Sequence, residues 1–193
     1  MADATIRCMA ERARRGAPLT LEEIATTAVR LMDEAGVEGL SMRKLASELD
    51  VNPMSLYHHV ENKEALLKLI CATAAERMRV PPDDGSPWQE QLRELALAYH
   101  RNAKEHPALW GYLHTHPEVI SHRGLPLWST LYRILRLAGV PEPEVRRTGD
   151  ILHAFVSGFI LAEINGHMPD DPEEIERNYD TAVHLIINGL AGF

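Results

Sequence analysis

The sequence predicts an all-α protein, with a small N-terminal helical domain followed by a larger helical domain. Almost every segment carries apolar residues at helical spacing, and alternating Val/Ile/Thr-rich runs bounded by hairpin turns are absent. The chain has 193 residues, of which 45% are hydrophobic, so it can bury a sizeable core. We expect an arm over residues 1–19, the small domain over 20–66 and the larger domain over 67–193.

The first helix is expected to begin after Thr20 and to end at Gly36. Thr20 and Glu23 have the spacing at which a threonine and a glutamate cap each other's backbone amides. Glycine is the residue that most often terminates a helix. Ser41 can then cap a short second helix.

The third and fourth helices follow closely. Asn52 and Pro53 form a strong start signal, because asparagine accepts from free amides and proline at the first helical position sacrifices no hydrogen bond. This predicts a third helix over residues 53–59. Asn62 can cap a fourth helix, which runs to about residue 79.

The clearest break in the chain is VPPDDGSP, residues 80–87, which is rich in proline. Beyond it, the apolar spacing predicts five helices. They are expected at about residues 87–105, 107–114, 122–138, 142–166 and 172–191.

Three short helices with a tight turn between the second and third match a helix-turn-helix. The third helix is expected to bury Leu56 and Val60 and to turn its other side outward. Such a helix fits the DNA major groove, which is about 12 Å wide. We therefore predict DNA binding by residues in and around this helix. They are Ser41, Arg43, Asn52, Pro53, Met54, Ser55, Tyr57, His58, His59 and Lys63.

Several of these residues are placed to contact phosphate. Tyr57 and His59 follow the front of the third helix, and Lys63 stands at the start of the fourth, where the helix end favours negative charge. Ser41 and Arg43 have the same role at the second helix. Single residues have plainer interpretations: the tyrosine can half-cover the core, paired histidines are often inert, and the methionine can contact no base. The prediction depends on the joint pattern.

The run GVEGLSMRKLASELDVNPMSLYHHVENKEALL resembles the DNA-binding domain of the TetR family of bacterial transcriptional repressors. The resemblance covers roughly residues 20–68. Within it, RKLA…LYHHVENKEALL is most similar to the tetracycline-repressor subgroup. The resemblance implies that residues 52–59 form the recognition helix. It also implies that Tyr57, His59 and Lys63 contact phosphates and that Arg43 reaches a base.

Two residues depart from the family pattern. Asp50 stands where the family usually has glycine, so we expect an aspartate in a left-handed conformation, which aspartate tolerates better than most residues. His58 stands where the subgroup tends to carry tryptophan, so base preference does not transfer. The arm before the first helix carries four arginines that either enter a minor groove or form a solvated tail. They are Arg7, Arg12, Arg14 and Arg15.

The net charge of −8 excludes bulk attraction to nucleic acid or anionic membrane, so DNA contact must come from local cations and helix ends. Cys8 and Cys71 have no metal-ligand spacing and no sign of pairing, which indicates a reducing compartment. No apolar run approaches the ~20 residues of a membrane span, and no secretory signal is present. We expect a cytoplasmic protein without a membrane partner.

The larger domain carries no G-x-S-x-G, glycine-rich phosphate loop or H-E-x-x-H, so we expect no enzyme and no cofactor. Its aromatic residues are spread over several helices and can line an apolar pocket for a small molecule, as the TetR resemblance also implies. Ordinary core packing is the alternative. The predicted ligand-binding residues are Tyr99, Trp110, Leu113, His114, Trp128, Leu131, Tyr132, Phe155 and Phe159.

Three histidines in and around LHTHPEVISH raise a metal hypothesis. His114 and His116 are two residues apart, which places them on different sides of a helix. A metal site with His122 would need the loop to fold back and supply a further ligand such as Glu118. A solvated loop is the simpler interpretation, and we predict no metal site.

The last two long helices are apolar over more than one stripe. Two such helices can pair with their symmetry mates as a four-helix interface. A two-fold dimer is also what two major-groove half-sites about 34–36 Å apart require. Packing within one subunit is the alternative. The predicted interface residues are Ile151, Phe155, Phe159, Ala182, Val183, Ile186, Ile187 and Leu190.

These expectations combine into a homodimeric transcriptional regulator, a repressor released from a palindromic DNA operator by a small hydrophobic or amphipathic inducer. The fourth helix is the expected lever, because it joins Lys63 to the pocket. Two rivals belong to other classes. One is an enzyme that uses His114 or His116 in the aromatic cavity, and turnover or bound metal would favour it. The other is a protein-interaction module without DNA binding, which the net charge slightly favours and the phosphate-contact pattern disfavours.

Overall fold

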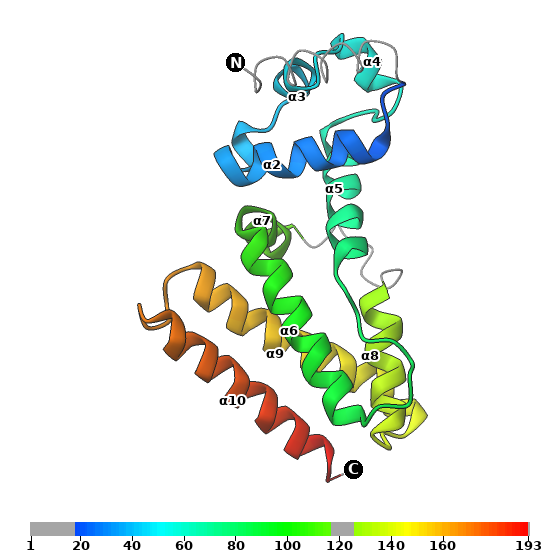
Figure 1. The fold of residues 1–193 in the computed structure, drawn as a ribbon, viewed down its shortest axis with the longest axis vertical. Helices are drawn as coiled ribbons and strands as arrows, with labels where there is room; N and C mark the ends of the chain where they lie inside the picture. The colour runs from blue at the N-terminus through cyan, green and yellow to red at the C-terminus, as the bar shows by residue number, and fades with distance from the viewer. Residues whose placement is uncertain (1–17, 117–125, 193) are drawn as a thin grey trace, which may run out of the picture.

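A computed structural model describes residues 18–116 and 126–192 of the chain. All regular secondary structure in these residues is helical, which confirms the all-α prediction. Figure 1 shows a small helical head joined by one helix to a larger bundle. The helices of the head are α2 (Leu21–Gly39), α3 (Met42–Glu48), α4 (Pro53–Tyr57) and the first turns of α5 (Lys63–Arg77). Those of the bundle are α6 (Trp88–Glu105), α7 (Pro107–Thr115), α8 (Pro126–Leu137), α9 (Glu142–Ile164) and α10 (Pro172–Leu190).

The predicted helix starts are confirmed in the head. Thr20 and Glu23 form a reciprocal capping box at α2, and the Ser41 hydroxyl accepts from the Lys44 amide at 3.2 Å at α3. The Asn62 side chain accepts from the Ala65 amide at 2.8 Å at α5. Each cap satisfies an amide that has no partner within its helix.

Two helix ends differ slightly from the sequence prediction. Gly36 leaves the helical path with φ 68°, as expected, but a further turn continues to Gly39. The third helix was expected over residues 53–59, whereas α4 ends at Tyr57 and the two histidines form the turn that follows. The first residues of the helix predicted over 122–138 lie outside the described part.

One hydrophobic cluster fills the head. Leu56 and Val60 are buried in it together with Ile24, Leu31 and other residues of α2, α3 and α5, as predicted. The cluster continues along α5 to Ala74, and α7 packs beneath α2 with a fully buried leucine, Leu109. A hydrogen bond of 2.9 Å between the Asp33 carboxylate of α2 and His106 Nδ1, which precedes α7, joins the head to the bundle. The head therefore rests on α5 and α7.

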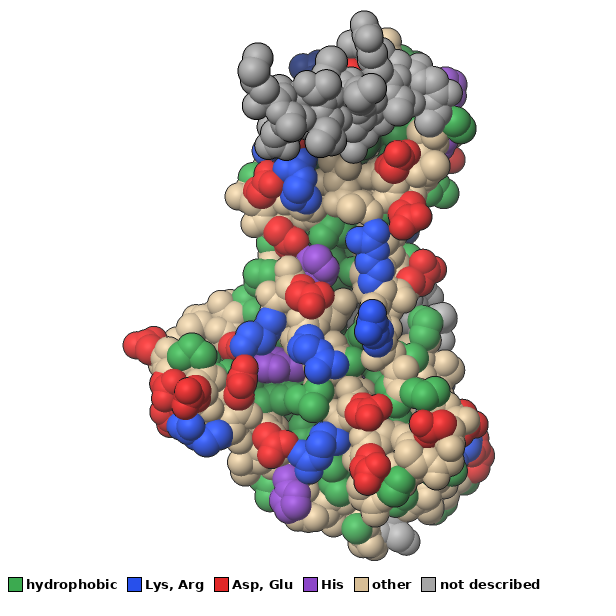
Figure 2. Space-filling model, viewed as in Figure 1, with side chains coloured by type: hydrophobic (Ala, Val, Ile, Leu, Met, Phe, Trp, Pro, Cys, Tyr) green, Lys and Arg blue, Asp and Glu red, His purple; other side chains and the backbone are tan. Residues whose placement is uncertain are grey.

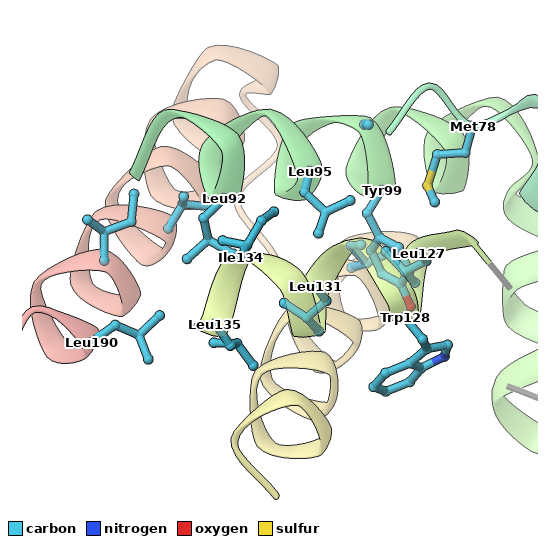
Figure 3. Packing of buried hydrophobic residues seen from close by; sticks show 14 of the residues in the cluster. Met78, Leu92, Leu95, Tyr99, Leu127, Trp128, Leu131, Ile134, Leu135 and Leu190 are labelled. Carbon is cyan, nitrogen blue, oxygen red and sulfur yellow. The ribbon is translucent and has the colours of Figure 1, made fainter. Parts of the chain in front are cut away.

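A second cluster forms the core of the bundle. Figure 3 shows leucines of α6 facing α8, with Leu131 and Ile134 between them. Tyr179 of α10 closes one side, and its hydroxyl donates to the Ala96 carbonyl of α6 at 2.7 Å. This packing holds α6, α8, α9 and α10 together.

The proline-rich segment between α5 and α6 is anchored to α8. The Arg133 guanidinium donates to the carbonyls of Pro81 at 3.0 Å and Pro82 at 3.3 Å, and to the Asp83 carboxylate at 3.0 Å. It also donates to the Gln91 side chain at 2.6 Å. Gln91 is buried and donates to the Ser86 carbonyl at 2.8 Å.

Acidic and basic side chains are interspersed over the face of the bundle that Figure 2 shows. This mixture is consistent with a protein whose charge does not attract DNA in bulk. Among the described residues, no helix is both long and apolar enough to cross a membrane.

Candidate functional site

The turn between α3 and α4 fixes the orientation of the short helix. Asp50 adopts φ 53°, which confirms the left-handed aspartate expected at this position. Asn52 then caps α4 by accepting from the Met54 amide at 2.9 Å, and Pro53 occupies the first helical position. Behind this turn, Leu56 and Val60 anchor α4 and its C-terminal turn in the core of the head.

The opposite side of α4 is exposed. Met54 is 63% exposed and Tyr57 is 45% exposed, and the side chains of His58 and His59 also lie at the surface. Ser55 is half-buried beside them. The tyrosine and the paired histidines are therefore accessible at the surface, as the residues of a DNA-contacting helix must be.

The predicted phosphate-contacting residues surround this helix. Arg43 lies exposed on α3, and within residues 18–116 and 126–192 its guanidinium makes no hydrogen bond or ion pair. The Lys63 ammonium is also exposed, but it donates to the Val37 carbonyl of α2 at 2.9 Å. The oxygen atoms of Ser41 and Asn52 serve as helix caps, so their contribution to the site is first to position the backbone. The arginines predicted for the N-terminal arm lie outside the described residues.

A cavity of about 230 Å³ lies in the bundle beneath the head. Its walls come from α5, α6, α7, α8 and α9. Five of the predicted ligand-binding residues line it, namely Tyr99, Trp110, Leu113, His114 and Trp128. The remaining lining residues are Cys71, Ala74, Ala75, Met78, Asn102, Leu109, Leu127, His153, Ser157, Ile160, Leu161 and Ile164.

Four predicted ligand-binding residues lie outside this lining, which corrects the prediction. Leu131 faces a smaller cavity of about 50 Å³. Tyr132 packs against Gly149, and its hydroxyl is buried without a hydrogen-bond partner among the described residues. Phe155 is 50% exposed, and Phe159 packs edge-on against Tyr179 with ring centroids 5.2 Å apart.

Three polar residues of the cavity were not predicted from the sequence, namely Asn102, His153 and Ser157. The Tyr99 hydroxyl lies 2.8 Å from His153 Nε2 and 2.9 Å from Ser157 Oγ. Burial raises the pKa of the Tyr99 phenol well above its usual value, although the hydrogen bond from Ser157 opposes the shift, so the phenol stays protonated. His153 and Ser157 are four residues apart, which places them on one face of α9 with Ile160. That spacing was a usable signal.

Cys71 is another lining residue that was not predicted for the cavity. Burial raises the pKa of its thiol to about 12. The thiol therefore contributes to the cavity as a small apolar group and not as a nucleophile.

The described histidines of the α7 region do not assemble a metal site. The side chain of His116 stacks on Tyr112 with ring centroids 3.9 Å apart, while His114 lies exposed at the rim of the cavity. No group of three or more His, Cys, Asp or Glu side chains within the described ranges can hold a metal ion. His122 and Glu118, the other ligands of the metal hypothesis, lie outside these ranges.

The predicted dimer residues divide between two sides of α9 and α10. Ile151 is 58% exposed and Phe155 is 50% exposed on α9, and Ala182 and Ile186 are half-buried on α10. Phe159 is also half-buried. The other three predicted residues are buried in the core of the subunit. They are Val183, Ile187 and Leu190.

Comparison with known proteins agrees with this division into a head and a bundle. Residues 24–70 match the bacterial regulatory proteins of the tetR family, and residues 92–186 match a tetracyclin repressor-like C-terminal domain. The tetracycline repressor protein class G of Vibrio anguillarum is 36% identical over 181 residues, which cover 86% of this chain and 81% of the relative. An HTH-type transcriptional regulator of Saccharopolyspora erythraea is 31% identical over 154 residues, covering 79% of this chain and 65% of the relative. The chain thus spans less than two thirds of the second relative's length.

Two solved structures share the fold over nearly their whole length. ActR of Streptomyces coelicolor in complex with actinorhodin has a TM-score of 0.71 and 26% identity, covering 90% of this chain and 96% of that chain. BioQ with its natural double-stranded DNA operator has a TM-score of 0.69 and 26% identity, covering 91% and 99%. The matches to both domains and the identity to the Vibrio repressor show that this chain belongs to the TetR family of transcriptional regulators.

Proposed function

We propose that this protein is a ligand-responsive DNA-binding transcriptional repressor that leaves a palindromic operator when a small hydrophobic or amphipathic inducer binds. The observation that carries the proposal is the outward side of α4. The exposed methionine and tyrosine of α4 and the histidines of the turn that follows lie on a segment that Leu56 and Val60 hold in the core. A related structure contains operator DNA and another contains a small molecule, which supports both halves of the proposal.

In this proposal, α4 enters the major groove and its neighbours contact the backbone. Met54, Ser55 and His58 face the base edges, whereas Tyr57 and His59 contact phosphates on either side. Arg43 and Lys63 supply the local cations that a protein of net charge −8 needs at its DNA surface. Phosphate contacts position the helix, and base contacts select the sequence.

Two subunits are proposed to bind together through the outward sides of α9 and α10. Ile151 and Phe155 expose apolar area on α9 that a symmetry mate can cover. Such a dimer places two copies of α4 on successive major grooves, about 34–36 Å apart along the operator.

The cavity is proposed to communicate with the head through the two helices that support it. Cys71 and Ala74 of α5 line the cavity, and the same helix begins at Lys63 in the head. Leu109 of α7 lines the cavity and is also buried in the hydrophobic cluster of the head. A ligand that prefers a different position of α5 or α7 therefore shifts the population toward dimers whose two α4 helices no longer match adjacent grooves.

The test is selection of bound fragments from random duplex DNA. We expect a palindrome whose half-sites are one helical turn apart. His58→Ala should change the preferred bases, whereas His167→Ala, which removes an exposed histidine after α9, should leave them unchanged. Selection without a palindrome, or the same preferred sequence for both variants, would contradict the proposal.

A further inference from the structure

We infer that the cavity binds an uncharged aromatic compound of about two fused rings, which places one hydroxyl or carbonyl oxygen against Ser157 and Tyr99. This inference rests on the proposed function, because it names the chemical class of the inducer. It is argued from the size of the cavity, the charge of its lining, its aromatic walls and the hydrogen-bonding capacity of its polar atoms.

The size of the cavity limits the ligand. A buried apolar cavity of roughly 150 Å³ holds one benzene molecule. The cavity beneath the head has a volume of about 230 Å³, half as large again. Two fused six-membered rings are therefore the size of compound that fills it without displacing its walls.

The lining disfavours a charged ligand. None of the described residues that line the cavity is Lys, Arg, Asp or Glu. Glu163 lies on α9 between Ile160 and Ile164, which both line the cavity, but its carboxylate turns to α6, where His100 lies at 2.5 Å and Lys104 at 3.4 Å. An ionised ligand would lose its hydration and would meet no Lys, Arg, Asp or Glu side chain among these lining residues, which is costly in a largely apolar environment.

The aromatic walls favour a flat ring system. Trp110 meets Tyr99 edge-on, with ring centroids 4.6 Å apart and an interplanar angle of 76°. The His153 ring lies 5.6 Å from the Tyr99 ring and 4.9 Å from that of Trp128, so the four rings form a continuous aromatic group. Aromatic rings attract one another in offset-stacked or edge-to-face arrangements, so a planar ligand gains contact energy against this group.

One group of polar atoms remains available to the ligand. The Tyr99 hydroxyl has two close neighbours, His153 Nε2 and Ser157 Oγ, but it has only one proton to donate. If it donates to His153, then Ser157 donates to Tyr99 and keeps its oxygen lone pairs for the ligand. If it donates to Ser157 while His153 Nε2–H donates to Tyr99, then the serine proton is left for the ligand, because the Nε2 atom that lies 3.4 Å from Ser157 Oγ already carries a proton. Ser157 can therefore accept from a hydroxyl or donate to a carbonyl.

Asn102 is another polar side chain of the lining, and it is already engaged. The Asn102 side chain donates to the Ala74 carbonyl at 3.1 Å and accepts from the Trp110 indole at 3.4 Å. These bonds fix Trp110 and tie α6 to α5. Inside the cavity the ligand thus meets spare hydrogen-bonding capacity at Ser157 and Tyr99, the polar anchor, while His114 lies at the exposed rim.

The experiment compares three probes that share one ring skeleton: 2-naphthol, naphthalene and 2-naphthoate. Binding to the purified full-length protein without DNA is measured by equilibrium dialysis. We expect 2-naphthol to bind about threefold to tenfold more tightly than naphthalene, the range for one net hydrogen bond. We expect 2-naphthoate to bind at least about tenfold more weakly than 2-naphthol, because its charge is not compensated.

Variants assign the preference to the polar anchor. Ser157→Ala and Tyr99→Phe should reduce the preference for 2-naphthol over naphthalene to less than about twofold while naphthalene still binds, which also shows that the cavity is intact. Ser129→Ala is the matched control, because its hydroxyl is exposed on α8 and bonds the Pro126 carbonyl. This variant should keep the preference.

The inference is overturned if 2-naphthoate binds as tightly as 2-naphthol, if Ser157→Ala keeps the preference, or if none of the probes binds. Each of these results leaves the proposed function standing when the protein still selects a palindromic DNA sequence. Conversely, failure to select such a sequence counts against the proposed repressor, whatever the probes show. As a last measurement, 2-naphthol should lower occupancy of the selected operator more than 2-naphthoate at equal concentration.

Discussion

Replacing Phe155 by alanine should weaken the proposed homodimer without unfolding the subunit. Phe155 is 50% exposed on the outward side of α9. Complete burial of a phenylalanine side chain contributes roughly 1.5–3 kcal/mol, so covering the exposed half contributes about half of that in each subunit. A two-fold axis brings two copies to the interface. The loss for the dimer is therefore roughly 1.5–3 kcal/mol, which raises the dimer Kd by about 10- to 150-fold.

Sedimentation equilibrium over a dilution series measures this change directly. The control is Leu137→Ala at the end of α8, because Leu137 is 52% exposed but does not belong to α9 or α10. Circular dichroism checks that both variants remain helical. The reasoning is refuted if Phe155→Ala leaves the dimer Kd unchanged, or if Leu137→Ala weakens the dimer equally.

Three further substitutions test the head and the bundle. Asp50→Gly should raise the free energy of unfolding, measured by urea denaturation, by about 0.5–1 kcal/mol. The reason is that a backbone φ of 53° is strained for aspartate but readily adopted by glycine. A less stable variant would contradict this strain. Gly149→Ala should lower the free energy of unfolding by about 1–3 kcal/mol, because the added Cβ would lie 2.7 Å from a Tyr132 ring carbon. An unchanged urea midpoint would count against this close packing. Lys63→Ala should reduce the slope of log K for operator binding against log salt concentration by about one. Lys68→Ala is the control, because the Lys68 ammonium pairs with Glu64, and this variant should keep the slope. Equal slopes for both variants would contradict a phosphate contact by Lys63.

The head could be predicted from the sequence because its signals are local. Thr20, Ser41, Asn52 and Asn62 each cap a helix a few residues away, so spacing alone identified them. The left-handed turn was equally local, because Asp50 occupies a position between two helices where the chain must reverse.

The cavity and the dimer surface could be predicted only in part, because they depend on contacts between distant segments. Tyr99 and Ser157 are hydrogen-bonded although they are 58 residues apart in the sequence, and no local sequence pattern indicates that contact. On α10, apolar residues lie on more than one side of the helix. Only the packing of α6 against α10 decides that Val183 and Ile187 face inward.

The hydrogen bonds of the Arg133 guanidinium restrict how α5 and α8 can move relative to each other. A segment that contains three prolines between two helices suggests a flexible linker that would let the helices move independently. Here the Arg133 side chain of α8 donates to three acceptors on that segment and to one on α6. The segment therefore cannot extend or reorient without breaking several hydrogen bonds at once. A displacement of α5 along its axis should therefore displace α8 as well, and we expect the two helices to move together.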